Sequence, residues 1–288
     1  MRSRLVLLVA MLAVAVVAAD AYAAKGGPSP GAVIGWDGVR APDAAVRYVA
    51  LVARGTTSLA VVRVGDGRVL RYVPLKGEFG VPQVAFDGTT DGLSGDKRTL
   101  VLSSLGTLVG ANRTSRFAVL ATKSLRVKRT IALPGLWSFD AVSPDGSTIY
   151  AIQYLGTGDV VDYKVRAIDV ASGRPLPGAI IDRREPNEEM RGSPTTRAFG
   201  PGRAWAYTLY GKPDGTAFVH ALDTRRGEAV CIDLPWSSVQ EAIWSVRMSV
   251  AGDGRTLTLR QATQGRLAVV DLGSFRVRAF RPPVAPVS

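Results

Sequence analysis

The sequence predicts an all-β domain made of five similar units, and three observations in its 288 residues lead to this prediction. Short apolar runs alternate with turns rich in glycine, proline and aspartate along most of the chain, as in antiparallel strands. The same pair of hairpins recurs five times. After the N-terminal segment, no stretch has the length and the 3.6-residue periodicity of a useful helix.

The N-terminal segment has the three parts of a secretory signal peptide. Residues 1–4 are basic, residues 5–19 form an apolar run, and Ala21 to Ala23 supply the small-residue cleavage pattern. We expect cleavage after Ala23, a flexible leader over residues 24–31, and a chain exported to the periplasm or the cell exterior. A retained membrane anchor is the alternative, although an apolar run of this length is shorter than the roughly 20 residues that span a bilayer.

The repeat is clearest in the third unit. Residues 141–152 (AVSPDGSTIYAI) place two apolar runs around Ser-Pro-Asp-Gly, which predicts a hairpin. Residues 163–181 (YKVRAIDVASGRPLPGAII) predict a second hairpin that turns at residues 171–173. One unit therefore contains four strands.

Both hairpins recur along the chain. The turns of the first hairpin follow one another at spacings of 53, 49, 56 and 52 residues. These turns lie at residues 41–43, 94–96, 144–146, 200–202 and 252–254. The second hairpin lies at residues 59–73, 117–131, 165–179, 219–233 and 267–281.

A period near 50 residues with four strands per unit is typical of a β-propeller, in which neighbouring blades bury each other's faces. We predict a single five-bladed domain over residues 32–283, with four antiparallel strands per blade and a tail at 284–288. Residues 32–36 are expected in the innermost strand of the first blade, and residues 276–281 in the outermost strand of the last. The expected blades are residues 32–78, 79–134, 135–182, 198–235 and 243–283.

The turns also resemble those of a known group. The SPDG and D-x-x-S-G turns of the third unit resemble the blades of TolB-like and YVTN-repeat propellers, which are WD-repeat-like domains of bacterial exported proteins. The other units match more loosely, but the resemblance covers nearly the whole chain after residue 23. It implies the fold and an exported location, and it implies no activity.

One face of such a domain is the expected binding face. The loops that join blades, and those that join the two hairpins of a blade, share a face of a propeller. Here these loops are long and varied, as functional loops tend to be. They include residues 76–83, 104–116, 154–164, 182–197 and 235–242.

Large aromatic residues lie at or near these connections. They have two interpretations: a rim that binds a partner, since aromatic rings supply much binding energy, or wedges that fill the space between blades. The aromatic candidates for partner binding are Phe79, Trp137, Tyr154 and Trp236; Phe199 and Trp244 lie in similar positions.

Residues 182–197 form the longest connection, and its charges are of mixed sign. We predict a mobile loop that is either a solvated surface or a partner contact. The candidate contact residues in it are Glu185, Glu188, Glu189 and Arg191.

Three aspartates follow an aromatic residue at the start of predicted innermost strands: Asp37, Asp87 and Asp140. Five-bladed glycosidases place carboxylates around the axis, and glycoside hydrolysis needs two carboxyl groups that flank one bond. Strand-end capping is the alternative role for these aspartates.

Other chemistries have little support. Cys231 is the only cysteine and His220 the only histidine, so a disulfide, a cysteine metal cluster and a zinc site are not expected, and neither is a cofactor. The net charge of +12 suits an acidic envelope polymer or a dispersed solvated surface. Aromatic residues are too sparse in the basic segments for nucleic-acid binding.

The sequence therefore favours a non-enzymatic binding or scaffold protein at the cell envelope, monomeric, whose partner is a protein or an acidic envelope polymer. The alternative is a glycan-active enzyme that uses the three aspartates.

Overall fold

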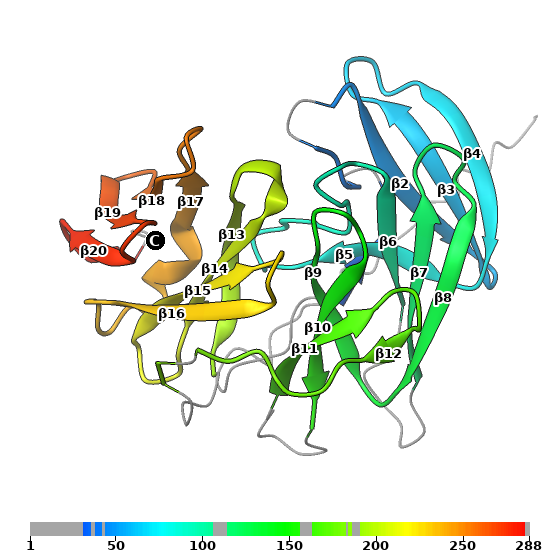
Figure 1. The fold of residues 1–288 in the computed structure, drawn as a ribbon. Coiled ribbons are helices and arrows are strands. Elements are labelled where there is room, and N and C mark those ends of the chain that lie inside the picture. The colour runs from blue at the N-terminus through cyan, green and yellow to red at the C-terminus, as the bar shows by residue number, and fades with distance from the viewer. Residues whose placement is uncertain are drawn as a thin grey trace, which may run out of the picture.

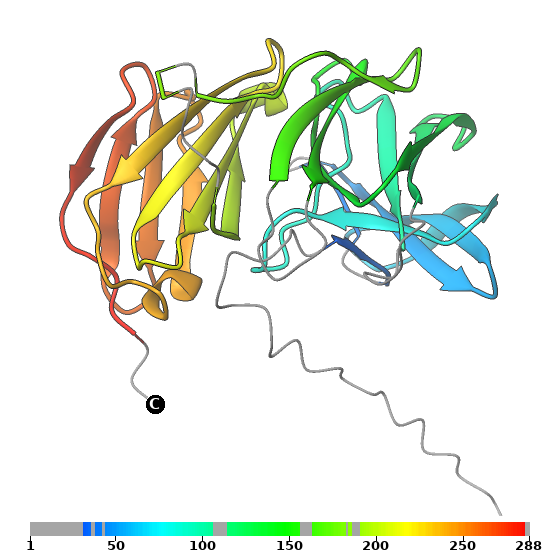
Figure 2. The same cartoon turned by 90° about the horizontal axis from the view of Figure 1, so that it is seen from below.

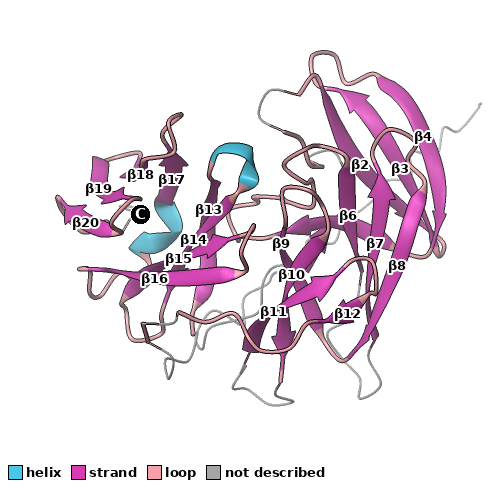
Figure 3. Cartoon of the chain, in the orientation of Figure 1, coloured by secondary structure: helices cyan, strands magenta, loops and turns pink. Residues whose placement is uncertain are grey.

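The computed structural model describes residues 31–35, 38–41, 44–105, 114–155, 163–182, 184–185 and 191–285. Strands make up its regular structure, with two short 3-10 turns, η1 (Pro201–Arg203) and η2 (Ala242–Ser245), as Figure 3 shows. The all-β prediction is confirmed. The predicted signal peptide lies outside the described residues. Within the described part of the chain, no helix is long and apolar enough to cross a membrane.

The strands form five sheets, which we number in chain order. Sheet 1 contains β2 (Val46–Ala53), β3 (Thr56–Arg63) and β4 (Val69–Lys76). Sheet 2 contains β1 (Gly31–Val33), β5 (Phe79–Gln83), β6 (Thr99–Ser104), β7 (Thr114–Ala121) and β8 (Val127–Pro134). Sheet 3 contains β9 (Trp137–Val142), β10 (Thr148–Tyr154), β11 (Tyr163–Asp169) and β12 (Arg174–Pro175).

The last two sheets have four strands each, in chain order. Sheet 4 contains β13 (Ser193–Phe199), β14 (Trp205–Gly211), β15 (Ala217–Asp223) and β16 (Glu228–Leu234). Sheet 5 contains β17 (Val246–Val250), β18 (Thr256–Gln261), β19 (Gly265–Asp271) and β20 (Arg276–Ala279). Each strand pairs antiparallel with its neighbours, and β20 is the outermost strand of sheet 5, as predicted.

The hairpin turns follow from local chemistry. In the β9–β10 turn, the Oδ1 atom of Asp145 accepts hydrogen bonds from the Ser143 hydroxyl at 2.6 Å and from the Ser147 backbone N–H at 3.0 Å. Gly146 has a φ of 73°, which a residue with a side chain rarely adopts. Local hydrogen bonds and the positive φ of glycine are therefore sufficient to explain the Pro-Asp-Gly turn, and no functional site is needed to account for it.

Two predicted strand positions are wrong. β1 pairs with β5 and so extends sheet 2, whereas the bridge between Val39 and Tyr48 lies beside sheet 1. β13 begins at Ser193, so the predicted connection of residues 182–197 ends in a strand. The serine, threonine and arginine side chains at the start of β13 resemble a loop in the sequence, but they are buried against other sheets.

The five sheets follow one another in an arc, with sheets 1 and 5 at its two ends (Figures 1 and 2). Apolar clusters fill the spaces between successive sheets. The connection from β5 to β6 reaches across the arc, because the backbone N–H groups of Phe86 and Asp87 donate to the carbonyl oxygens of Pro194 and Thr195 at 2.9 and 3.1 Å. It thereby links sheet 2 to the innermost strand of sheet 4.

Candidate functional site

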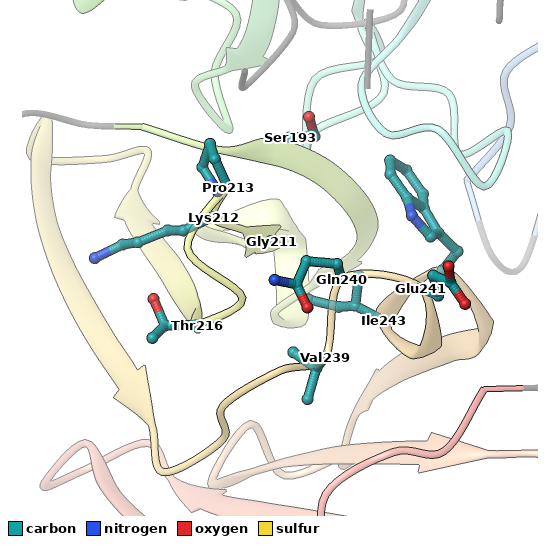
Figure 4. A pocket seen from close by; sticks show the side chains of 10 residues that line it. Ser193, Gly211, Lys212, Pro213, Thr216, Val239, Gln240, Glu241 and Ile243 are labelled. Carbon is teal, nitrogen blue, oxygen red and sulfur yellow. The ribbon is translucent and has the colours of Figure 1, made fainter. Parts of the chain in front are cut away.

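A hollow of about 410 Å³ opens between sheets 4 and 5, among the connections predicted to form the binding face (Figure 4). Three segments line it: the start of β13, the β14–β15 connection and the β16–β17 connection. Its polar and aromatic lining residues are Ser193, Lys212, Thr216, Gln240, Glu241 and Trp244.

The β16–β17 connection is fixed by its apolar residues. The side chains of Trp236, Val239 and Ile243 are buried in the cluster between sheets 4 and 5. The Val239 N–H also donates to the Gly215 carbonyl at 3.1 Å. Gly215 has a φ of 86°, and a Cβ atom there would lie 2.6 Å from the Gln240 amide nitrogen. Glycine thus allows the two connections to approach each other.

The lining combines opposite charges with an aromatic ring. Lys212 and Glu241 lie on opposite sides of the hollow in Figure 4. The Lys212 ammonium lies 4.9 Å from the centroid of the Phe218 ring. Trp244 is 38% exposed, and its ring meets the Phe86 ring edge-on at a centroid distance of 5.7 Å. These groups can bind a polar segment that has an apolar side chain, but they include no pair of groups suited to acid–base catalysis.

The four aromatic residues that the sequence suggested for partner binding are buried, whereas Trp244 is partly exposed. Phe79, Trp137, Tyr154 and Trp236 are 5%, 7%, 9% and 3% exposed, and each belongs to a cluster between two sheets. The Trp137 indole N–H donates to the Pro134 carbonyl at 2.9 Å. These positions agree with the wedge interpretation, in which the rings hold neighbouring sheets together.

The charged connection is fixed at its first end. The Oδ2 atom of Asp182 accepts a hydrogen bond from the Cys231 N–H at 2.8 Å and pairs with the Arg184 guanidinium at 2.6 Å. Glu185 and Arg191 are exposed. Glu188 and Glu189 lie outside the described residues.

The three aspartates are not alike. Asp140 in β9 is buried and forms an ion pair with Arg197 of β13, which also donates to the Asp140 carbonyl oxygen. Asp87 accepts hydrogen bonds from the Thr89 N–H at 2.9 Å and from its hydroxyl at 2.7 Å, as a turn residue does. Asp37 lies outside the described residues.

A row of polar residues that the sequence did not predict lies between sheets 3 and 4, buried except for the half-buried Cys231. Arg197, Thr208, His220 and Cys231 are direct cross-strand partners on β13 to β16. The Arg197 Nε atom donates to the Thr208 hydroxyl at 2.9 Å, and His220 Nδ1 lies 3.9 Å from Cys231 Sγ. Thr208, His220 and Cys231 lie in predicted strands and were a signal available in the sequence, whereas Arg197 fell in the predicted connection of residues 182–197.

Burial shifts the pKa values of titratable groups in and near this row. Burial lowers the pKa of His220, with Arg197 acting in the same direction and Asp140 and Asp182 opposing it. Burial also raises the pKa of Tyr163 and that of Tyr210. Among the described residues, neither the His220 Nε2 atom nor the Tyr163 hydroxyl has a hydrogen-bond partner. Burial therefore keeps the His220 imidazole and the phenols of Tyr163 and Tyr210 neutral inside the protein.

In the part of the chain that the structure describes, no three histidine, cysteine, aspartate or glutamate side chains are grouped so as to hold a metal ion.

Comparison with known proteins gives structural neighbours. No family model matches the chain, and no curated protein matches it. Hydrazine synthase of Kuenenia stuttgartiensis is similar over 83% of this chain and 69% of its own, at 15% identity and a TM-score of 0.46. TolB from Acinetobacter baumannii is similar over 82% and 68%, at 12% identity and a TM-score of 0.39. The β-propeller domain of Swd1 from Myceliophteria thermophila is similar over 81% and 69%, at 10% identity and a TM-score of 0.46.

The neighbours include TolB and other propeller proteins, as the resemblance noted in the sequence predicted. At these identities and TM-scores they give no information about a ligand or an activity. The five sheets of the described residues define the fold.

Proposed function

We propose that the chain is an exported, non-enzymatic binding protein of the five-bladed β-propeller type that recognises a protein partner at the hollow between sheets 4 and 5. The main support is the hollow itself, because it lies among the blade-joining and hairpin-joining connections and has a partly exposed tryptophan at its edge. Exposed tryptophans beside a pocket are frequent energetic centres of protein interfaces.

The chemistry of the lining favours a peptide segment as the occupant. Lys212 and Glu241 offer opposite charges to the two ends of a short polar stretch. Trp244, which is 38% exposed, offers ring surface to an apolar side chain. A volume of 410 Å³ accommodates a few residues rather than a folded surface.

The glycosidase alternative receives no specific support from the geometry. A general acid or base must reach the proton that it transfers. Asp140 is 2% exposed and paired with Arg197, and Asp87 is engaged in its own turn. We therefore do not propose catalysis.

Export is tested by the mature N-terminus. If a signal peptidase cleaves after Ala23, the exported protein should begin at Ala24. Edman sequencing or mass spectrometry of the protein recovered outside the cytoplasmic membrane checks this, and retention of Met1 on that protein would contradict cleavage.

Partner recognition is tested with Trp244→Ala. The wild-type protein is immobilised, a cell-envelope extract is passed over it, and the captured proteins are identified. We expect Trp244→Ala to reduce capture of the specific partner at least tenfold, since a central tryptophan typically contributes 2 kcal/mol or more.

Tyr72→Ala is the matched control, because Tyr72 is an exposed aromatic residue on sheet 1, far from the hollow (69% exposed). It should leave capture unchanged. Equal loss in both variants, or no loss in Trp244→Ala, would refute recognition at the hollow. Circular dichroism of all three proteins shows that the fold is retained.

A further inference from the structure

The outer face of sheet 5 is lined with arginine. Val246, Leu257 and Leu259 point into the cluster shared with sheet 4, so the residues next to them in the strands face the opposite side. In Figures 1 and 2, sheet 4 lies on one side of sheet 5 and no described strand covers the other. The exposed arginines of this outer face are Arg247, Arg260, Arg266, Arg276 and Arg278.

Three of these arginines stand side by side. Arg260 of β18 is the cross-strand partner of both Arg247 on β17 and Arg266 on β19. Like charges directly opposite each other in a sheet are destabilising. This row therefore weakens the sheet unless an anion lies against it.

The row has few compensating charges. The Asp87 carboxylate lies 3.9 Å from Arg247 at one edge of the face. Asp271 is opposite Arg276 at the other end of the strands. Among the described residues of the four strands, Asp271 is the only carboxylate on either face. The middle of the outer face is therefore cationic.

An exposed aromatic ring completes the surface. The guanidinium carbons of Arg266 and Arg278 lie 5.5 and 5.2 Å from the centroid of the Phe280 ring. Stacking of this kind holds guanidinium groups in place while their N–H donors stay available. Arg266 and Arg278 are thus preorganised for an external ligand.

We propose that the outer face of sheet 5 binds a linear phosphate polymer. Neighbouring strands lie about 4.7–4.9 Å apart, so a chain that crosses them meets one arginine per strand. The phosphate groups of such a polymer recur along its chain, and each one offers two non-bridging oxygens that a guanidinium group can bind in a bidentate manner. The surface adjoins the hollow at Arg247, whose guanidinium group donates to the Trp244 carbonyl oxygen at 2.8 Å, but the proposal does not depend on the function proposed there.

The test measures binding of fluorescently labelled inorganic polyphosphate to the full chain by anisotropy. Arg260→Ser/Arg266→Ser/Arg278→Ser removes three charges from the face and leaves Arg247, which contacts Asp87. We expect its affinity to fall about thirtyfold, and the dependence of binding on salt concentration to become weaker because fewer counterions are released.

The matched control is Arg126→Ser/Lys128→Ser/Arg129→Ser, which removes three exposed charges from and beside β8 of sheet 2. It should change the affinity by less than threefold. Equal loss in both triple variants would show that net charge alone is responsible and would overturn the proposal. Tighter binding to vesicles of phosphatidylglycerol than to polyphosphate would also overturn it.

The variant Trp244→Ala distinguishes polyphosphate binding at sheet 5 from partner binding at the hollow. This variant should bind polyphosphate like the wild type, even though it loses the protein partner. A loss of polyphosphate binding in Trp244→Ala would mean that the phosphate site is not on the outer face of sheet 5.

Discussion

The two faces of sheet 4 differ although they are built from adjacent residues of the same strands. Toward sheet 5, Leu209, Val219 and Ile232 are cross-strand partners in an apolar cluster. Toward sheet 3, the residues one position away are Thr208, His220 and Cys231, and they continue the row from Arg197. The interface with sheet 5 is held by apolar burial, whereas the interface with sheet 3 combines an apolar cluster with the buried polar row.

The difference matters because the two kinds of contact depend differently on geometry. Apolar burial is non-directional and scales with the area removed from water. A buried ion pair requires both partners in place, since the loss of one leaves an uncompensated charge. The interface between sheets 3 and 4 should therefore tolerate less displacement than the interface between sheets 4 and 5.

The largest expected effect comes from breaking the ion pair on one side. Arg197→Met leaves the buried Asp140 carboxylate without its partner, and we expect the free energy of unfolding to fall by about 3–5 kcal/mol. Urea denaturation followed by circular dichroism measures the change. The double variant Asp140→Leu/Arg197→Met removes both charges and should recover most of the loss; a double variant as unstable as the single one would contradict this account.

On the apolar face, Leu209→Ala removes a fully buried side chain from the cluster between sheets 4 and 5. The lost burial and the cavity left behind should lower the free energy of unfolding by about 3 kcal/mol. Leu51→Ala, at an exposed leucine of sheet 1, is the control and should cost less than about 1 kcal/mol. Similar losses in both variants would show that Leu209 is not packed as described.

The smallest expected effect is a pH dependence of the free energy of unfolding, which arises from His220 on the face of sheet 4 toward sheet 3. Burial lowers the pKa of His220, so below the unfolded value of about 6.5 the unfolded chain binds a proton that the folded chain does not. The free energy of unfolding should fall with decreasing pH between about 6.5 and the folded pKa, by at most about 1.4 kcal/mol per pH unit. Above pH 7 this group should contribute no dependence.

Because His220 is the only histidine, His220→Phe should remove this dependence between pH 7 and pH 5.5, where carboxylates contribute little. Thermal denaturation of both proteins across that range provides the measurement. An unchanged pH dependence in the variant would show that His220 titrates alike in the folded and unfolded chains.

The sequence by itself determined the hairpins, because their causes are local. The Pro-Asp-Gly turn closes through the contacts of Asp145 with Ser143 and Ser147 and through the positive φ of Gly146. The period of about 50 residues then indicated how many such units follow one another. The second hairpin of each unit was found at the predicted place, from β3–β4 to β19–β20.

Only the tertiary structure decided which polar residues are buried and which sheet each end strand joins. Residues 31–33 can pair with either of two strand edges, and their sequence does not distinguish β5 from a strand of sheet 1. Residues 193–197 are mostly polar and were expected in a loop, yet they form a buried strand in which Arg197 pairs with Asp140 of another sheet. Trp244 and Trp236 lie in the same connection, and only the packing of sheet 5 buries one and leaves the other partly exposed. In each case the outcome depends on a contact with a residue that is distant in the sequence. A local sequence pattern carries information only about interactions between residues that are close in the chain.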